Sequence, residues 1–306
     1  MSEKVKNRSE ILFVYDIRDG NPNGDPLDEN KPRIDEERGI NLVTDVRLKR
    51  TIRDYLHNFK GQEIFVREIV YDKQNMYIQD GKRRAKDFGE NAEMILNECI
   101  DVRLFGGVIP LKGDSITYTG PVQFKMGRSL HRVNMKHIKG TGAFASKEGS
   151  KQATFREEDI LPYSLILFYG IINENAAKHT NLSEEDITLL LEGIWNGTKN
   201  LISRTKAGQV PRLLLKVNYS KVNYHIGDLD KMVKLVTKMH HESIRDTTDF
   251  QLEISELIGK LATEKSSIKD IEICVDDRMK FSKEGISFSI EELAKVTGIA
   301  IKPLAF

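Results

Sequence analysis

The stretch from residue 10 to residue 60 constrains the fold more than any other part of the chain. An apolar run at 11–17 enters a turn at 21–26 that contains two Asn, two Pro and one Gly, and a basic segment at 43–60 follows. In that segment apolar residues recur every three or four positions from Leu48 onward, which predicts a helix with one apolar face. A strand, a stiff turn and an amphipathic helix therefore open the fold.

The helix at 43–60 carries four cations within residues 47–53. Thr44 or Asp45 can cap its start, and Gly61 suits its end. Because the apolar residues share one face, we expect the cations to point away from the core. Free N–H groups at a helix start and nearby cations favour phosphate, whereas a solvated helix face is the other usual meaning of a charge run, and the pattern leaves both open. The cations are Arg47, Lys49, Arg50 and Arg53.

The turn before this helix resembles a calcium-binding loop only at its beginning. Residues 19–24 place oxygen-bearing side chains at alternate positions and Gly at the sixth. The twelfth position would need Glu and is Asn30, and Pro22 interrupts the loop. We therefore interpret the segment as a rigid turn that presents Asn21, Asn23 and, further on, Arg33.

Charge is sorted along the chain although the net charge is only +1. Residues 121–156 hold eight Lys or Arg against the single acid Glu148, and residues 199–221 hold six bases and no acid. Residues 224–306 reverse the balance, with 12 bases and 15 acids. Concentrated basic surface of this kind is typical of a groove that binds a polyanion.

The composition also predicts a compartment. No apolar run reaches the length of a membrane span, and the N-terminus lacks the apolar stretch of a signal peptide, so we expect a cytoplasmic protein without a membrane partner. Cys99 and Cys274 are the only cysteines and lie far apart, which argues against a disulfide framework or a four-thiolate zinc site. The pairs His131/His137 and His240/His241 also lack a zinc-ligand frame and are interpreted as surface histidines.

The remaining pattern predicts an α+β chain. In its simplest form the order is β-α-β-β-α-β, which is the ferredoxin-like arrangement of the RNA-recognition motif. The acidic C-terminal part is predicted to add two amphipathic helices, a short strand and a helix capped by Ser289. The predicted elements after the first helix are a strand at 64–71, a solvated loop at 82–86, a helix at 88–99, a strand at 116–124 bent at Gly120-Pro121, a polar loop at 131–156, a strand at 161–172, a helix from Ser183 to Ile202, a strand at 213–219, helices near 229–236 and 254–261, and a strand at 271–275.

Four sequence segments together carry a resemblance to a known family. They are Asn21 to Pro26, Leu42 to Arg50, Gly120 to Phe124 with Gly127 to Leu130, and Arg204 to Lys206. In this order they resemble the CRISPR-associated backbone subunit of type I Cascade, the Cas seven superfamily, and are most similar to its subtype I-B and I-C branch. The resemblance spans roughly residues 9 to 220.

This resemblance implies a hand-shaped protein that binds RNA. It implies an RNA-recognition-type palm over 1–225, a helical finger at about 72–107, a thumb at about 129–158 and a C-terminal extension over 226–306. Copies would stack head to tail along one CRISPR guide RNA, beside other Cascade subunits, and the guide would pair with target DNA in antiviral defence. The subunit would be non-catalytic, with no cofactor and no metal.

The resemblance also implies which side chains meet the RNA. Lys49 and Arg50 would hold guide phosphates, while Thr44 and Asp45 would order the helix start. The aromatic sheet motif of ordinary RNA-recognition proteins is absent, so backbone capture is expected instead of base stacking. The full set is Asn21, Asn23, Arg33, Thr44, Asp45, Arg47, Lys49, Arg50, Arg53, Gln123, Arg128, Lys136, Lys139, Phe144, Arg204 and Lys206.

Two rival interpretations remain at this stage. One is a metal-dependent CRISPR-associated ribonuclease, since related backbone subunits cut RNA with a thumb-loop Asp, and such chemistry needs carboxylates beside the scissile phosphate. Here residues 129–156 offer only Glu148, and the acids between Asp16 and Asp28 alternate with turn formers. The other rival is a structural protein without nucleic acid. The RNA-binding interpretation requires the cations of 47–53, 136–139 and 204–212 to converge in one track.

Overall fold

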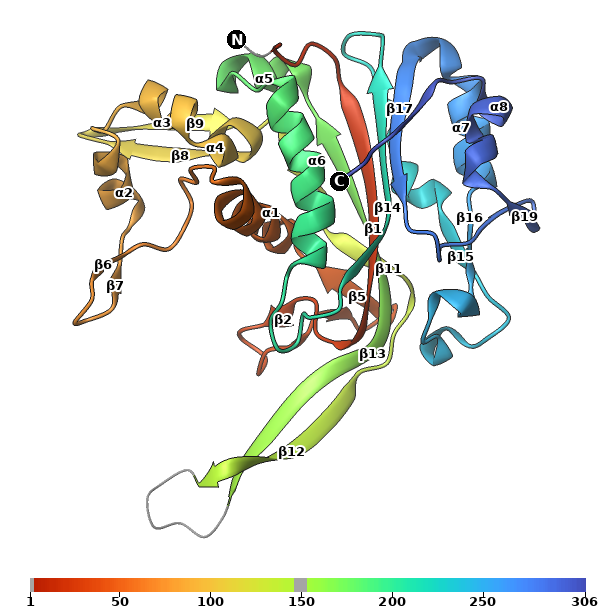
Figure 1. Ribbon diagram of the computed structural model, residues 1–306, viewed down its shortest axis with the longest axis horizontal. Coiled ribbons are helices and arrows are strands. Elements are labelled where there is room, and N and C mark those ends of the chain that lie inside the picture. The colour runs from red at the N-terminus through yellow and green to blue at the C-terminus, as the bar shows by residue number, and fades with distance from the viewer. Residues whose placement is uncertain (1–2, 146–152) are drawn as a thin grey trace.

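A large twisted sheet forms the centre of the computed structural model, which describes residues 3–145 and 153–306, the side chains of 141–145 and 153–156 excepted (Figure 1). Its strand order is β20-β17-β14-β1-β13-β11-β5-β4, and β10 and β12 also pair with β13. The pairs β14–β1, β1–β13 and β13–β11 are all antiparallel. The chain is thus an α+β protein, as the sequence predicts.

Strand β1 (Ser9–Gly20) is buried on both faces, and its successive side chains point to opposite sides of the sheet. Ile11, Phe13 and Tyr15 pack against the two long helices α1 and α6. Leu12 and Val14 face the other way, into a core shared with the C-terminal residues. The predicted first strand therefore lies between two separate hydrophobic cores.

The two long helices begin and end where local sequence signals place them. In α1 (Asp45–Lys60) Thr44 is the N-cap and Gly61, at φ 64°, closes the helix. In α6 (Glu184–Lys199) Ser183 and Asp186 form a reciprocal capping box. Phe59 continues the apolar spacing that begins at Leu48, but it does not lie on the buried face of the helix. Its side chain is 59% exposed, and its ring stacks on Tyr55.

The segment predicted as a strand at 64–71 is irregular instead. Ile64 and Phe65 are buried, but the Asp101 carboxylate accepts hydrogen bonds from the backbone N–H groups of Phe65 and Val66. Those donors are then not available for a strand ladder. Strand pairing begins only at Val70, in a small hairpin.

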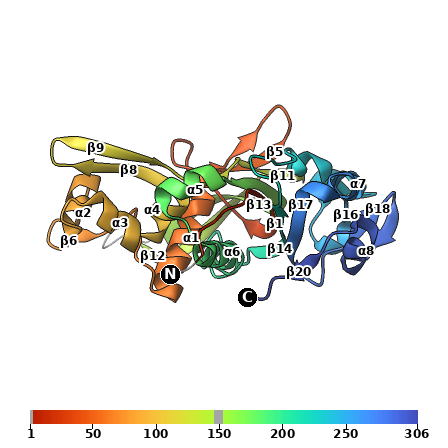
Figure 2. The same cartoon turned by 90° about the horizontal axis from the view of Figure 1, so that it is seen from above.

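The segment predicted as a solvated loop at 82–86 is part of helix α2. Its Arg84 is buried, donates to the carbonyl of Ile64 at 3.0 Å and pairs with Glu63 and Asp87. Helices α2 to α4 and the two strands β8 and β9 surround a small core of their own around Ile95 and Cys99. Figure 2 shows this unit at one end of the molecule. The 88–99 prediction corresponds to α3, which begins only after the chain turns at Gly89.

The described part of the segment predicted as a long polar loop is mostly a β-ribbon that extends from the central sheet (Figure 1), and residues 146–152 lie outside the description. Residues 136–141 pair with 155–160, and β13 continues from the ribbon into the central sheet. Cross-strand contacts join His137 to Asp159 at 3.0 Å and Lys139 to Glu157 at 2.9 Å. Because neither face of the ribbon is covered, the sequence lacks the alternation of apolar and polar residues by which strands are predicted.

The C-terminal residues cover the second face of the central sheet and extend it through β17. The predicted helix near 229–236 is a short 3-10 turn followed by strand β15, and Ser289 makes no capping hydrogen bond. Strand β14 shows the predicted alternation, but its polar residues Arg212 and Lys216 are also buried.

The strands not yet bounded are β2 (Gly24–Asp25), β3 (Lys31–Pro32), β4 (Ile34–Asp35), β5 (Ile40–Val43), β6 (Val70–Asp72), β7 (Tyr77–Ile78), β8 (Gly106–Leu111), β9 (Asp114–Thr119), β10 (Val122–Phe124), β11 (Gly127–Arg132), β12 (Lys136–Ala145), β13 (Ala153–Ile172), β14 (Val210–Tyr219), β15 (Lys234–Val236), β16 (Gln251–Glu253), β17 (Ile268–Val275), β18 (Phe281–Lys283), β19 (Ile286–Phe288) and β20 (Ile301–Pro303). The further α-helices are α2 (Gly81–Asp87), α3 (Ala92–Glu98), α4 (Ile100–Phe105), α5 (Glu174–Thr180), α7 (Ser255–Thr263) and α8 (Leu293–Thr297). Among the described residues, no helix combines the length and the apolar character needed to cross a bilayer.

Candidate nucleic-acid interface

The turn before α1 holds the start of that helix in place. The side-chain oxygen of Asn23 accepts hydrogen bonds from the backbone N–H of Thr44 at 2.8 Å and from its hydroxyl at 2.9 Å. Thr44 in turn accepts from the N–H of Arg47 at 3.2 Å. The sequence placed Asn23 and Thr44 in one site, and the structure gives both a positioning role there.

The same turn contacts the basic loop before β14. The backbone N–H of Asn21 donates to the carbonyl of Thr205 at 2.7 Å, and its side-chain nitrogen donates to the carbonyl of Asn30 at 2.6 Å. The Asn21 side-chain oxygen is buried and has no hydrogen-bond partner. Segments about 180 residues apart in the sequence thus meet beside the N-terminal end of α1.

Arg47 and Lys206 lie close enough at this meeting point for the charge of Arg47 to act on Lys206. Arg47 donates to the Thr51 hydroxyl at 3.1 Å, but its Nε is buried without a partner. Burial lowers the pKa of the Arg47 guanidinium, and burial together with the charge of Arg47 lowers the pKa of the Lys206 ammonium. In the described part of the chain no carboxylate forms an ion pair with either side chain. An anion placed between them would relieve both effects.

The other predicted cations of α1 are already paired. Lys49 binds Asp45 at 3.0 Å and Arg50 binds Asp54 at 2.7 Å. Arg53 does not point into solvent as predicted, because it pairs at 2.8 Å with the fully buried Asp101. Asp54 is close enough to favour the charged form of Arg47, but its carboxylate is bound by Arg50. The helix therefore offers one unpaired cation, at its first turn.

The base of the β12–β13 ribbon brings two more predicted segments together. Arg204 pairs with Glu158 at 3.1 Å on one face of the ribbon, and the Lys139–Glu157 pair lies on the opposite face. Lys136 is exposed nearby on β12. The side chain of Phe144 lies outside the described residues.

The last three predicted residues lie around the same region but in separate contacts. Gln123 accepts from Lys49 at 3.1 Å. Arg33 pairs with Asp25 at 2.8 Å, and its Nε is buried without a partner. Arg128 is exposed, 3.4 Å from Asp35. None of these contacts by itself identifies a ligand.

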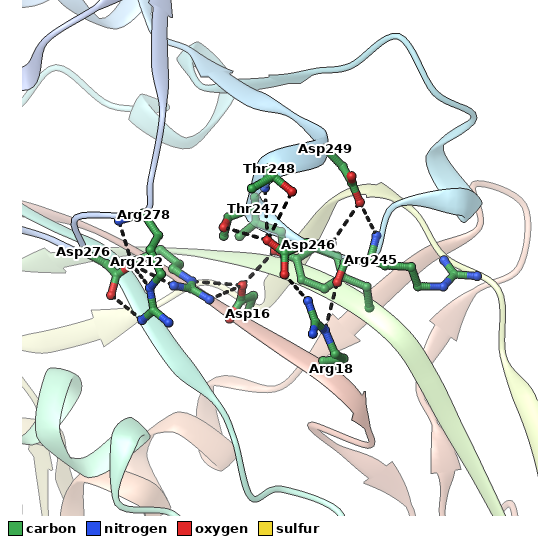
Figure 3. Close-up of polar contacts among 12 residues, drawn as sticks. Asp16, Arg18, Arg212, Arg245, Asp246, Thr247, Thr248, Asp249, Asp276 and Arg278 are labelled. Atoms are coloured by element: carbon green, nitrogen blue, oxygen red, sulfur yellow. Dashed lines mark hydrogen bonds and ion pairs between the residues drawn. The ribbon is translucent and has the colours of Figure 1, made fainter.

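Arg212 does not join this surface, which corrects the expectation for 204–212. It is 7% exposed and binds Asp16 at 2.8 Å and Asp276 at 2.7 Å, and Tyr163 also donates to Asp16 at 2.8 Å. Figure 3 shows this network, with Arg18 bonded to Asp246 beside it. Lys216 is likewise buried, in a pair with Glu272 at 2.7 Å. Strand β14 uses its cations to attach the C-terminal residues.

The acidic side chains considered for metal binding are separated by their partners. Asp25 binds Arg33 and Asp28 binds Lys31, while Asp16 belongs to the Arg212 network. Among the described residues no group of three or more His, Cys, Asp or Glu could hold a metal ion, and Glu148 lies outside them.

His131 is not a surface residue, contrary to the sequence interpretation. It is 1% exposed, its Nε2 accepts from the N–H of Leu165 at 3.2 Å, and burial lowers its pKa to about 4. Sequence reasoning missed it because an isolated His in a polar stretch carries no sign of burial.

Two side chains near Arg47 were also missed. Gln209 is buried with an unpartnered Nε2, and Tyr15 lines the same small cavity as Arg47 and Gln209. The one available signal was the position of Gln209, which is the only uncharged polar side chain between Lys206 and the predicted strand at 213–219.

Comparisons with known proteins give one consistent result. The family model described as CRISPR-associated protein Cas7 matches residues 7–255. A relative from Haloferax volcanii, named CRISPR-associated protein Cas7, is 34% identical over 302 residues, which cover 90% of this chain and 88% of the relative.

Solved structures resemble the whole fold. A chain of a CRISPR RNA-guided surveillance complex in a pre-nicking state matches with a TM-score of 0.56 at 12% identity, covering 95% of this chain and 99% of that one. A second chain, from a CRISPR RNA-guided surveillance complex, matches with a TM-score of 0.54 at 11% identity, covering 95% and 98%. At these identities the likeness concerns the fold.

Proposed function

Because the chain belongs to the CRISPR-associated Cas7 family, we propose that it is a non-catalytic backbone subunit that binds the guide RNA of a type I Cascade surveillance complex. Copies of the chain assemble head to tail on one guide, which pairs with target DNA in antiviral defence. Other Cascade subunits cap the assembly, and the subunit works in the cytoplasm without a cofactor. The sequence segments quoted above favour the I-B and I-C branch.

We further propose that the central sheet is a ferredoxin-like palm. The order β14-β1-β13-β11, with α1 after β1 and α6 after β13, supports this because a split β-α-β-β-α-β unit has the spatial order 4-1-3-2. The finger would comprise the α2–α4 unit, and the thumb would be the β12–β13 ribbon. The C-terminal residues would serve as an extension that packs on the palm.

The pair formed by Arg47 and Lys206 is the observation that carries the RNA-binding proposal. Arg47 in the first turn of α1 and Lys206 in the loop before β14 are two half-buried cations without a counter-ion among the described residues. Together they form a preorganised site for a phosphate group. Lys136 and Arg204 at the ribbon base would continue the track. Contacts of this kind hold any guide sequence, because phosphates carry no base identity.

The test compares binding of the intact protein to single-stranded RNAs of unrelated sequence. Arg47→Gln with Lys206→Gln should weaken binding about tenfold or more for every sequence, because both phosphate contacts are lost. The slope of log K against log salt should shrink by about 1.4, at roughly 0.7 per phosphate contact on a single strand. Lys280→Gln with Lys295→Gln, two exposed cations of the acidic C-terminal part, is the matched control and should bind normally.

Two outcomes would overturn the proposal. One is wild-type protein that binds no RNA or binds it without salt dependence. The other is a loss in the Arg47/Lys206 variant that is confined to particular sequences, which would indicate base readout.

A further inference from the structure

Leu27 is the most exposed large apolar side chain among the described residues. It lies at the tip of the β2–β3 hairpin and is 96% exposed. Isolated exposed apolar residues are common. A fully exposed apolar side chain on a rigid turn, however, can insert into an apolar pocket of a binding partner. Docking through Leu27 requires a rigid turn and a partner surface that is complementary to it.

The hairpin tip is fixed by its own hydrogen bonds. The N–H of Leu27 donates to the Asp25 carboxylate at 3.0 Å, and the N–H of Asn30 donates to the Asp25 carbonyl at 2.8 Å. Lys31 pairs with Asp28 at 2.7 Å, and the Asn21 side chain anchors Asn30 from below. A preorganised tip loses little conformational entropy when it binds.

The charge around Leu27 is negative on its exposed side. The carboxylates of Asp28 and Glu29 are 62% and 84% exposed, and the single cation Lys31 lies 2.7 Å from Asp28 and 3.7 Å from Glu29, so the two acids leave the tip with a net negative charge. Such a tip repels a sugar-phosphate chain, so RNA does not suit it although the RNA-binding residues are near. Its partner must offer an apolar hollow with cations around it.

The finger unit has a hollow of that kind, of about 330 Å³. Tyr71 and Ile78 provide the apolar lining, and both are about half exposed. Three cations line it against the single acid Asp80, whose carboxylate accepts from the N–H of Arg83 at 2.8 Å. The Arg83 guanidinium lies over the Tyr71 ring, 3.6 Å from its centre. The cations are Lys82, Arg83 and Lys86.

We propose that the Leu27 tip of one copy docks in the finger hollow of the next copy, with Asp28 and Glu29 facing the hollow's cations. The β2–β3 hairpin lies near the base of the ribbon, whereas α2 and the β6–β7 hairpin, whose residues line the hollow, lie at the far end of the finger unit (Figure 1). Because the two surfaces differ and lie apart on the chain, the contact is heterologous and repeats from copy to copy. The proposal rests on the proposed function, which supplies the RNA along which copies line up.

Another hollow of the same chain fits the tip less well. The one lined by the acids Asp25, Asp28 and Glu36 and by the cations Lys31 and Arg33 has a comparable volume of about 350 Å³, and both cations are already paired, with Asp28 and Asp25. Its acids would face Asp28 and Glu29 of the incoming tip, and like charges at an interface oppose association. Charge therefore selects the finger hollow.

The decisive experiment uses two charge-reversed chains on a long single-stranded RNA. The tip variant is Asp28→Lys with Glu29→Lys, and the hollow variant is Lys82→Glu with Lys86→Glu. Each alone should assemble at least about tenfold more weakly than wild type, measured by light scattering or sedimentation. An equimolar mixture should assemble like wild type, because each reversed surface then meets a complementary one in strict alternation.

Replacement of the apolar tip residue Leu27 tests the same contact and leaves the charges of the hollow unchanged. Leu27→Asp should also weaken assembly about tenfold, whereas Ile286→Asp, at a 72% exposed apolar residue of β19, should not. Binding to an RNA too short for two copies should be unchanged in the tip variants and in Leu27→Asp. Normal short-RNA binding in these chains separates a failure of this contact from a failure of the proposed function.

Several results would overturn the docking proposal. The mixture could fail to rescue assembly, or the tip variants could assemble like wild type. A hollow variant that loses short-RNA binding would instead identify the hollow as a nucleic-acid site.

Discussion

Arg212 and Lys206 come from the same acid-free segment and have opposite environments. Arg212 is buried between Asp16 and Asp276, and its charge is fully compensated. Lys206, six residues earlier, faces Arg47 without a carboxylate partner in the described part of the chain, and its pKa is lowered. The position of the acids makes this difference, because Asp16 of β1 and Asp276, which follows β17, both lie beside Arg212.

The difference shows that a basic segment is not by itself a binding surface. In the ordered network of Figure 3 the cations join two parts of the fold. On the Arg47 side the same residue types remain uncompensated, which costs stability and favours an incoming anion. We therefore expect substitutions on the two sides to act on different properties.

The largest effect is expected on the compensated side. Arg212→Ala leaves the buried carboxylates of Asp16 and Asp276 without their main partner, so the free energy of unfolding should fall by roughly 3–5 kcal/mol in urea denaturation. Arg278→Ala removes an exposed partner of Asp276 and should cost less than about 1 kcal/mol. If folded Arg212→Ala protein were of normal stability but defective in RNA binding, the comparison would be wrong.

Acid should destabilise the same side through His131. Its pKa is about 4 in the folded chain and near 6.5 when unfolded, so between these values the unfolded chain binds more protons. Stability is then complete above about pH 6.5 and falls as the pH is lowered, by about 2 kcal/mol at pH 5. His131→Gln should be less stable at pH 7 and less sensitive to this change. Parallel stability curves for the two proteins would exclude His131 as the cause.

A smaller effect of opposite sign is expected at Lys206. Lys206→Met keeps the side-chain length and removes a half-buried charge that faces Arg47, so stability should rise by about 0.5 kcal/mol after screening by water. RNA affinity should fall in the same variant. A loss of both stability and affinity would mean that Lys206 has a structural partner that the geometry does not reveal.

The smallest effect is expected at Arg50. Its pair with Asp54 is exposed and spaced i, i+4 on α1, so Arg50→Ala should change the free energy of unfolding by about 0.3–0.5 kcal/mol. Thermal unfolding of the two variants should show a lower stability than wild type for Arg50→Ala and a higher one for Lys206→Met. A loss above about 1 kcal/mol would show that the surface of α1 is also part of a structural network.

The sequence by itself determined the local features of this protein. The caps Thr44 and Gly61, the capping box Ser183–Asp186 and the strands β1 and β14 follow from neighbouring residues, because capping and side-chain periodicity act within a few positions. The segregation of charge and the four family segments were equally visible. These features predicted the α+β class and the proposed interface around α1.

Only the tertiary structure decided which cations remain available. Arg53 is neutralised by Asp101, 48 residues away, and Arg212 by Asp276, 64 residues away, whereas Lys206 meets another cation. The ribbon and the irregular segment after α1 were missed for a related reason: their backbone hydrogen bonds are completed by distant partners. Electrostatic compensation and backbone pairing depend on distance in space, and one sequence without its fold does not contain that distance.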